Sequence, residues 1–383
     1  MMTIKLFDLD SHLQTFQGHV VACEEQKGLY QIILDQTAFF PTGGGQAADT
    51  GTLNDIPVTD VSETEQGIVH STTVPIEVGT KVFGKIDWQQ RFGRMQHHSG
   101  EHIVSGLIHE LYGYDNVGFH MGSNAVTIDY NGILTIEDVK RIEYLANEAV
   151  VKNVPVTANY PESKELERMH YRSKLDLTEN IRIVSIKGYD VCACCAPHVS
   201  DTGEVGLIKL LDCVPNRGGV RINMLCGFRA LEDYNKKFEQ VGAISNLLSA
   251  KQDEVSMAVE KLQKTLEETK QKLALANREL AHAKVKMIQP TEGNLVLFEK
   301  DLDSTTLREM VNTGMQLCGG ICAAFAGEDG SYRYVMGSKG VDLSAMAKEI
   351  HHALSGRGGG TQSMIQGSVQ CSKTEIEAYF SKQ

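Results

Sequence analysis

A stretch without helix breakers divides this chain. Residues 243–287 contain no glycine and no proline, the two residues that most readily end or bend a helix. Apolar and small residues repeat there every seven positions, which is the pattern of a coiled-coil seam. The repeating positions form two series: Val255, Leu262, Thr269, Ala276 and Ala283, then Val259, Leu266, Leu273, Leu280 and Met287. We therefore predict one long charged helix from about Leu231 to Met287, as the core of a coiled-coil spacer over residues 231–288.

The chain before the spacer changes its hydrophobic period once. Residues 1–88 contain short alternating runs such as LYQIILD and KVFGKIDW, separated by turn residues, which predicts a small all-β domain. From Gln89 the spacing becomes helical until Gly113. Thr135 and Asp138 have the spacing of a capping box that begins a second helix.

Several strand-like runs alternate with these two helices. The runs are NAVTIDY, VPVTANY, IRIVSIK, EVGLIKLL and GVRINMLC. Residues 89–230 are therefore predicted to form an α+β domain, and residues 289–383 a compact α/β domain with the glycine-rich turn SGRGGGTQSMIQGS.

Composition limits the classes of protein. The net charge of −12 opposes a nucleic-acid partner, unless local clusters of cations override it. Such clusters include Arg91 with Arg94, Arg168 with Arg172, and Arg217 with Arg221; each is typical of a solvated face or of a phosphate contact. No apolar run approaches the roughly 20 residues of a membrane span, and the first residues, MMTIKLFDLDSHLQ, lack the cationic flank and apolar core of a signal peptide. We expect a cytoplasmic protein without a membrane partner.

Two short motifs carry metal-binding residue types. In RMQHHSGEHIVSG, His98 and His102 lie four residues apart and would share one face of a helix. The same residues with Glu101 spell H-x-x-E-H, the signature of an inverted zinc protease, in which Glu101 would be the general base.

The second motif is rich in cysteine. Four of the nine cysteines lie between residues 192 and 213, which suits metal or free-thiol use in a reducing compartment. DVCACCAPHVSDTGEVG could complete a tetrahedral zinc site with thiolate and imidazole ligands. The best-matched ligands are His98, His102, Cys194 and His198. Cys192 or Cys195 could replace Cys194.

Three motifs in this order resemble one known family. HHSGEH, CCAPHVSDTGEVG and TAFFPTGGGQAADTG are similar to the editing domain of alanyl-tRNA synthetases and to the free-standing AlaX proteins, whose patterns are H-x-x-x-H and C-x-x-x-H followed by T-G-E-[IV]-G. The chain resembles the long AlaX form. This resemblance implies a multidomain α+β fold: an N-terminal β-barrel, a zinc-containing editing domain, a helical spacer and a glycine-rich C-terminal domain. In this family the residue between the two histidines need not be acidic.

The resemblance implies an activity. An alanine pocket cannot exclude glycine and rejects serine poorly, so a second site must remove such errors. We expect a zinc-dependent aminoacyl-tRNA deacylase that hydrolyses tRNA(Ala) mischarged with serine or glycine. Thr37 matches a family hydroxyl near the amino acid, while Gly44, Gly45 and Gln46 would approach the ester, with Gln46 as a donor to its carbonyl or to a water. Zinc could activate the water or anchor the substrate; anchoring is favoured because four protein ligands leave no open position.

Contacts with tRNA are expected in the editing domain and in the C-terminal domain. The predicted tRNA-binding residues are Arg94, Arg172, Arg357 and Gly358. The coiled coil or the C-terminal domain could also form a homodimer. Two other functions stay open: a zinc peptidase that uses Glu101, and a non-catalytic tRNA-binding protein with structural zinc.

Overall fold

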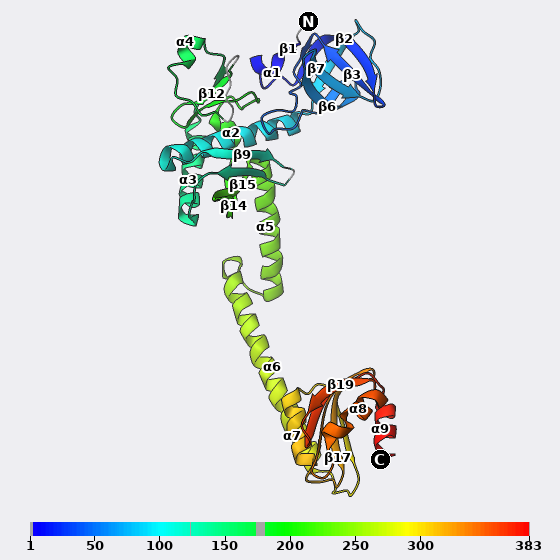
Figure 1. The fold of residues 1–383 in the computed structure, drawn as a ribbon. Coiled ribbons are helices and arrows are strands. Elements are labelled where there is room, and N and C mark those ends of the chain that lie inside the picture. Colours follow the sequence, from blue (N-terminus) through cyan, green and yellow to red (C-terminus); the bar gives the residue numbers. More distant parts are fainter. Residues whose placement is uncertain (1–2, 123, 174–180, 383) are drawn as a thin grey trace. The chain divides into compact units, whose positions relative to one another are not determined.

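The chain forms two compact units. The computed structural model describes residues 3–122, 124–173 and 181–382. One unit extends to Gln240 and the other begins at Val241 (Figure 1). Both contain helices and strands, so the expectation of a mixed α/β multidomain protein is confirmed.

Six strands of the first unit form a closed barrel in the order β2-β3-β7-β6-β5-β8. Their bounds are β2 Thr15–Gln26, β3 Leu29–Leu34, β5 Gly51–Leu53, β6 Ile56–Thr64, β7 Gly67–Thr72 and β8 Lys81–Ile86. Exposed and buried residues alternate along β8, so every second side chain enters the barrel core. Outside the barrel, β1 (Ile4–Lys5) pairs with β4 (Gln36–Thr37), and α1 (Leu6–Leu9) follows β1.

The rest of the first unit contains two antiparallel sheets and two long helices. The larger sheet has the order β14-β15-β10-β9, with β9 Asn116–Met121, β10 Val126–Tyr130, β14 Ile208–Asn216 and β15 Gly219–Cys226. The smaller has the order β11-β12-β13, with β11 Val156–Asn159, β12 Ile183–Ile186 and β13 Asp190–Ala193. The short helices are α4 (Ser163–Leu166) and the 3-10 helix η1 (Thr202–Val205).

One terminus of each long helix lies where the sequence predicts it. Helix α2 (Trp88–Tyr112) stops at Gly113, whose φ of 70° is left-handed. Helix α3 (Ile136–Lys152) begins with the predicted capping box of Thr135 and Asp138. The expectation that Glu204 and Val205 continue a strand is wrong, because both lie in η1.

A buried ion pair joins the barrel side of the unit to α2. Arg91 is fully buried and its Nε donates to Oδ2 of Asp49 at 2.8 Å. The same guanidinium donates to the carbonyl oxygens of Ala38 and Ser11, while Asp49 accepts from the backbone N–H of Phe40. The interpretation of Arg91 as part of a solvated face is therefore wrong; its charge is paired inside the protein.

The predicted single long helix is two helices. Helix α5 (Gly227–Leu248) ends at Ser249, which adopts a left-handed φ of 49°, and α6 (Val255–Lys286) follows the 3-10 turn η2 (Gln252–Glu254). The Ser245 hydroxyl donates to the carbonyl of Ala250 and closes the end of α5. A helix can thus end without glycine or proline when a polar side chain of its last turn binds a carbonyl just beyond its end. In the described part of the chain, no helix has both the length and the apolar character to cross a membrane.

The heptad positions begin with α6 itself. Its leucines Leu262, Leu273 and Leu280 are all more than half exposed. Pairing of this seam with a second copy stays a prediction.

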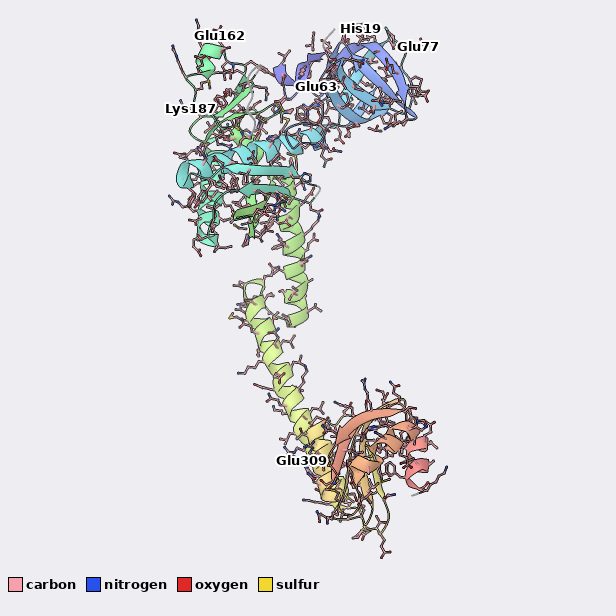
Figure 2. The ribbon with its side chains drawn as sticks, in the orientation of Figure 1. His19, Glu63, Glu77, Glu162, Lys187 and Glu309 are labelled. Carbon is pink, nitrogen blue, oxygen red and sulfur yellow. The ribbon has the colours of Figure 1, made fainter. Side chains whose placement is uncertain are left out.

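The second unit also contains a five-stranded sheet in the order β16-β17-β18-β20-β19. Its elements are β16 Leu295–Glu299, α7 Ser304–Gly314, β17 Ile321–Glu328, β18 Ser331–Ser338, α8 Leu343–Ala353, β19 Gly356–Gly360, β20 Met364–Val369 and α9 Lys373–Phe380. Glu309 of α7, labelled in Figure 2, accepts hydrogen bonds from Arg278 and His282 of α6. The end of α6 is thereby tied to this domain.

Removal of the Arg91 guanidinium should destabilise the first unit. Arg91→Ala leaves the buried Asp49 with only the longer contact to Arg94, at 3.7 Å, as its ion pair, and the loss of one partner of a buried pair costs about 3–5 kcal/mol of unfolding free energy. The matched control is Arg221→Ala, which breaks a pair with Asp129 that is partly exposed, and it should cost about 1 kcal/mol or less. Urea unfolding of both variants measures the difference, and equal losses would contradict this account.

Candidate functional site

Helix α2 presents the first pair of histidines. His98 and His102 lie one turn apart and both are buried, with ring centroids 5.4 Å apart. His97 faces elsewhere: Nδ1 donates to the carbonyl of Gly93, and Nε2 accepts from the backbone N–H of Cys226. Burial lowers the pKa of His97 to about 4, so this ring is a neutral structural group.

The second pair approaches from the segment after β13. Sγ of Cys194 lies 3.4 Å from Nε2 of His98 and 3.4 Å from Nε2 of His198. Together with His102, these side chains offer ligand atoms that all lie within 4.8 Å of one another. Zinc bound to sulfur at roughly 2.3 Å and nitrogen at roughly 2.0–2.1 Å in a tetrahedron places the two atoms roughly 3.5 Å apart. The donor set therefore fits zinc in type and spacing.

Each histidine is oriented by a different partner on its other ring nitrogen. Nδ1 of His98 lies 3.1 Å from Oε1 of Gln46, Nδ1 of His102 lies 2.8 Å from Oδ2 of Asp190, and Nδ1 of His198 lies 3.0 Å from Oγ of Ser99. Such partners fix the tautomer and the direction of a metal-binding imidazole. All three rings thus direct Nε2 toward the same point.

The electrostatics of the cluster favour a thiolate among imidazoles. Burial would raise the pKa of Cys194, but the neighbouring His98 and His198 lower that pKa well below its ordinary value. Burial lowers the pKa of His198 to about 3, which keeps its ring neutral. Metal ligands must be deprotonated, so these shifts suit metal binding.

The other two cysteines of the motif differ from Cys194. Burial raises the pKa of both Cys192 and Cys195, so neither is prepared as a thiolate. Cys192 forms a second potential ligand group with His102 and Asp190. Arg172 already binds both oxygens of Asp190, which makes this second group the poorer metal site.

The loop that carries Cys194 and His198 is held at its backbone. Arg182 donates to the carbonyls of Cys194 and Ala196 at 3.1 and 2.9 Å. The Ser11 hydroxyl donates to the carbonyl of His198 at 2.7 Å. These contacts keep the ligands in place from outside the cluster.

A cavity of about 630 Å³ opens beside the ligands. His98, His102 and Cys194 form part of its wall. Its other lining residues include Lys5, Gly44, Gly45, Glu101, Phe119, Tyr160, Arg172, Arg182 and Cys195. Cationic and aromatic side chains therefore surround a space next to the potential metal site, a combination that suits a nucleotide.

The glycine run lines part of this cavity. Gly44 and Gly45 have positive φ values of 59° and 80°. A Cβ on Gly45 would lie 2.7 Å from a ring carbon of Phe119, so the close approach requires glycine. Gln46 is 1% exposed, and within the described chain its Nε2 has no hydrogen-bond partner. The residue predicted to touch substrate is thus also the residue that orients His98.

Thr37 lies elsewhere. Its side chain is fully buried, and its hydroxyl donates to Nε2 of His70, whose Nδ1 donates to the carbonyl of Ile32. Thr37 does not line the cavity beside the ligands. Its predicted contact with serine stays a prediction.

The predicted tRNA-binding residues are distributed. Arg172 lines the cavity beside the metal ligands. Arg94 lines a separate cavity of about 710 Å³ with Arg229 and Phe228, and its guanidinium donates to the Ala48 carbonyl and the Gln90 side chain. Exposed residues of β19 in the second unit include Arg357 and Gly358.

Sequence reasoning missed three residues that shape the site: Ser99, Arg182 and Asp190. Asp190 had a usable signal, because Asp190, Cys192 and Cys194 alternate as on one face of a strand. Ser99 had none, because its partner His198 lies 99 residues away. Arg182 had none either, because a single arginine before a strand does not indicate a contact with the loop 12–14 residues later.

Two segments of this chain match known protein families. Residues 181–223 match the family described as the threonyl and alanyl tRNA synthetase second additional domain. Residues 11–90 match the family described as tRNA synthetases class II (A). The first of these segments contains Cys194 and His198.

Curated relatives match along most of the chain. The alanine–tRNA ligase of Ignicoccus hospitalis is 30% identical; the match covers 94% of this chain but only 40% of the ligase. The C-Ala domain of Aquifex aeolicus alanyl-tRNA synthetase is a solved structure that matches 25% of this chain and 96% of its own length, at 15% identity and a TM-score of 0.22.

Two editing proteins match over nearly their full lengths. The alanyl-tRNA editing protein AlaX-L of Pyrococcus horikoshii is 27% identical, and the match covers 98% of this chain and 96% of the relative. The alanyl-tRNA editing protein Aarsd1 of Danio rerio is 28% identical, with 96% and 95% covered. With the motif residues gathered into one cluster, this chain is similar along nearly its whole length to the alanyl-tRNA editing proteins AlaX-L and Aarsd1.

Proposed function

We propose that this protein is a zinc-dependent aminoacyl-tRNA deacylase that acts in trans on tRNA(Ala) mischarged with serine, and also on the glycyl ester. One observation carries the proposal: His98, His102, Cys194 and His198 converge beside a cavity that also has glycine backbone and cationic side chains in its wall. The names of the full-length relatives support the same activity.

The four clustered side chains would hold the zinc ion. When bound, zinc would supply a Lewis acid that polarises an ester or water, or an anchor for the substrate's amino group. Four protein ligands close a tetrahedral site, which favours the anchoring role.

The protein's own groups account for positioning. The backbone at Gly44 and Gly45 can approach the ester because no Cβ intervenes. Phe119 offers an apolar ring against the His98 ring, at a centroid distance of 5.1 Å. An ester held between these surfaces is oriented for attack, and orientation can supply much of the rate.

Contacts with the rest of the tRNA would come from separate surfaces. Arg172 lines the cavity beside the metal ligands, Arg94 lines a second cavity in the same unit, and Arg357 with Gly358 belongs to the C-terminal domain. The net charge of −12 implies that these contacts are few and salt-sensitive. A homodimer through α6 or the C-terminal domain belongs to the same proposal.

The activity should depend on both the amino acid and the metal. Purified protein should hydrolyse seryl-tRNA(Ala) and leave alanyl-tRNA(Ala) intact, and removal of the metal should slow the reaction about 100-fold or more, as expected when a reacting ester loses its position. Release of labelled amino acid, with and without added zinc, measures this. Bound tRNA without turnover of either ester would instead indicate a non-catalytic binding protein.

Variants of two adjacent cysteines should show which of them binds zinc. Cys194→Ala should lose zinc and seryl-tRNA hydrolysis together, because the thiolate between the imidazoles is gone. Cys195→Ala is the matched control: it alters the same loop at a cysteine outside the ligand cluster and should retain its zinc. Metal content by mass spectrometry decides, and full zinc content in Cys194→Ala would show that the ligand set is wrong.

Glu101 distinguishes an editing enzyme from a peptidase. Oε1 of Glu101 accepts from the Ser105 hydroxyl and from the Asn116 amide, so Glu101→Gln preserves its shape and one acceptor oxygen. A general base contributes roughly 10²–10⁴-fold, so a loss of seryl-tRNA hydrolysis below about tenfold excludes that role. We expect such a small loss, together with no peptide cleavage by the unmodified protein. Peptide cleavage that Glu101→Gln abolishes would support the peptidase.

A further inference from the structure

One buried carboxylate binds two residues of the site. Asp190 begins strand β13 and is 6% exposed. Its Oδ2 lies 2.8 Å from Nδ1 of His102 and 2.9 Å from Nη2 of Arg172, while Oδ1 lies 2.7 Å from Nε of Arg172. Cys194 follows on the same segment, so the carboxylate and a metal ligand share one local backbone.

The contact with His102 determines which ring nitrogen faces the cluster. An ionised carboxylate only accepts hydrogen bonds, so Nδ1 of His102 must carry the proton. In the neutral ring that a metal requires, Nε2 then keeps its lone pair, on the side where Cys194 and His198 lie. Without Asp190 the ring could take either tautomer and rotate away.

The contact with Arg172 fixes a cation at the edge of the cavity. Asp190 uses Nε and Nη2 of the guanidinium in a bidentate pair, which leaves three of its five N–H groups for other partners. The backbone of Arg172 is also fixed, because its N–H donates to the carbonyl of Val191 and its carbonyl accepts from the N–H of Ala193. Arg172 lines both the cavity beside the ligands and a neighbouring cavity of about 920 Å³.

The remaining N–H groups suit one part of the substrate. Near the ester, the anionic groups of an aminoacyl-tRNA are the backbone phosphates of its terminal nucleotides. A planar guanidinium that is already held by a carboxylate binds a phosphate with little further loss of side-chain freedom.

We propose that Asp190 is a positioning residue with two roles, one in metal binding and one in substrate binding. It directs Nε2 of His102 to the metal position, and it presents Arg172 to a phosphate of the terminal nucleotides. The phosphate half rests on the proposed function, whereas the His102 half concerns metal binding alone. Asp190 itself touches neither substrate nor metal.

The test compares Asp190→Asn with Arg172→Gln. The asparagine has the same shape but carries no charge, and one of the two acceptor oxygens becomes a donor. It therefore cannot keep all three hydrogen bonds, because its NH2 group faces either Nε of Arg172, or Nδ1 of His102 together with Nη2 of Arg172. We expect a 10–100-fold loss of zinc affinity, measured by competition with a chelator, which is the usual effect of losing such a partner. We also expect a rise in KM for seryl-tRNA(Ala) of about tenfold, a typical loss for one phosphate contact. Saturating zinc should restore kcat and leave KM high.

Arg172→Gln should affect only one of these quantities. Its KM should rise by a similar factor, while its zinc affinity stays within about threefold of the unmodified protein, because His102 keeps its partner. The matched control is Asp129→Asn, which breaks another bidentate pair of the same unit, with Arg221 at 2.7 and 2.8 Å. It should change neither quantity.

The outcomes separate the two halves. Unchanged zinc affinity and KM in a folded Asp190→Asn protein would overturn the proposal. If that variant does not fold, Arg172→Gln decides: an unchanged KM refutes the proposal, and a raised KM with intact zinc binding supports it. If the unmodified protein does not hydrolyse seryl-tRNA(Ala), the proposed function fails, while the zinc titration still decides the role of Asp190 toward His102.

Discussion

The close contact between helix α2 and the start of strand β13 underlies the whole site. Gly106 makes this contact possible: a Cβ there would lie 2.1 Å from the carbonyl oxygen of Tyr189 and 2.9 Å from Cβ of Asp190. Any larger residue would force the helix away from the strand. Because α2 carries His98 and His102 while the segment after β13 carries Cys194, this separation sets whether the ligand atoms can meet.

Several polar contacts then orient the ligand side chains that this packing brings together. The three imidazoles are each oriented by a separate residue, and these three partners come from the glycine-run loop, α2 and β13. The buried pair of Arg91 and Asp49 holds the start of α2 against the barrel side, next to the loop that carries Gln46. Barrel, helix and small sheet therefore each contribute to one cluster, which explains why the family motifs are spread over residues 37–206.

Thr37 and Arg91 illustrate that residue type alone does not identify the partner of a side chain. A threonine hydroxyl can serve a substrate or a neighbour, and here it bonds a buried histidine of the barrel. An arginine is usually solvated, yet Arg91 is fully buried. Asp49 and two carbonyl oxygens accept the hydrogen bonds of its guanidinium. In both cases the deciding partner lies more than 30 residues away, beyond the range of local patterns.

The sequence by itself determined the four ligand candidates and the ends of α2 and α3, because four-residue spacings and caps are local properties. Only the tertiary structure decided that Cys194 rather than Cys192 or Cys195 lies among the imidazoles, that Gln46 and Asp190 orient the rings, and that the long helix breaks at Ser249. These outcomes depend on which atoms packing brings within about 3 Å, at the separation where hydrogen bonds form. No spacing along the chain encodes that distance when the two partners are 52 or 88 residues apart.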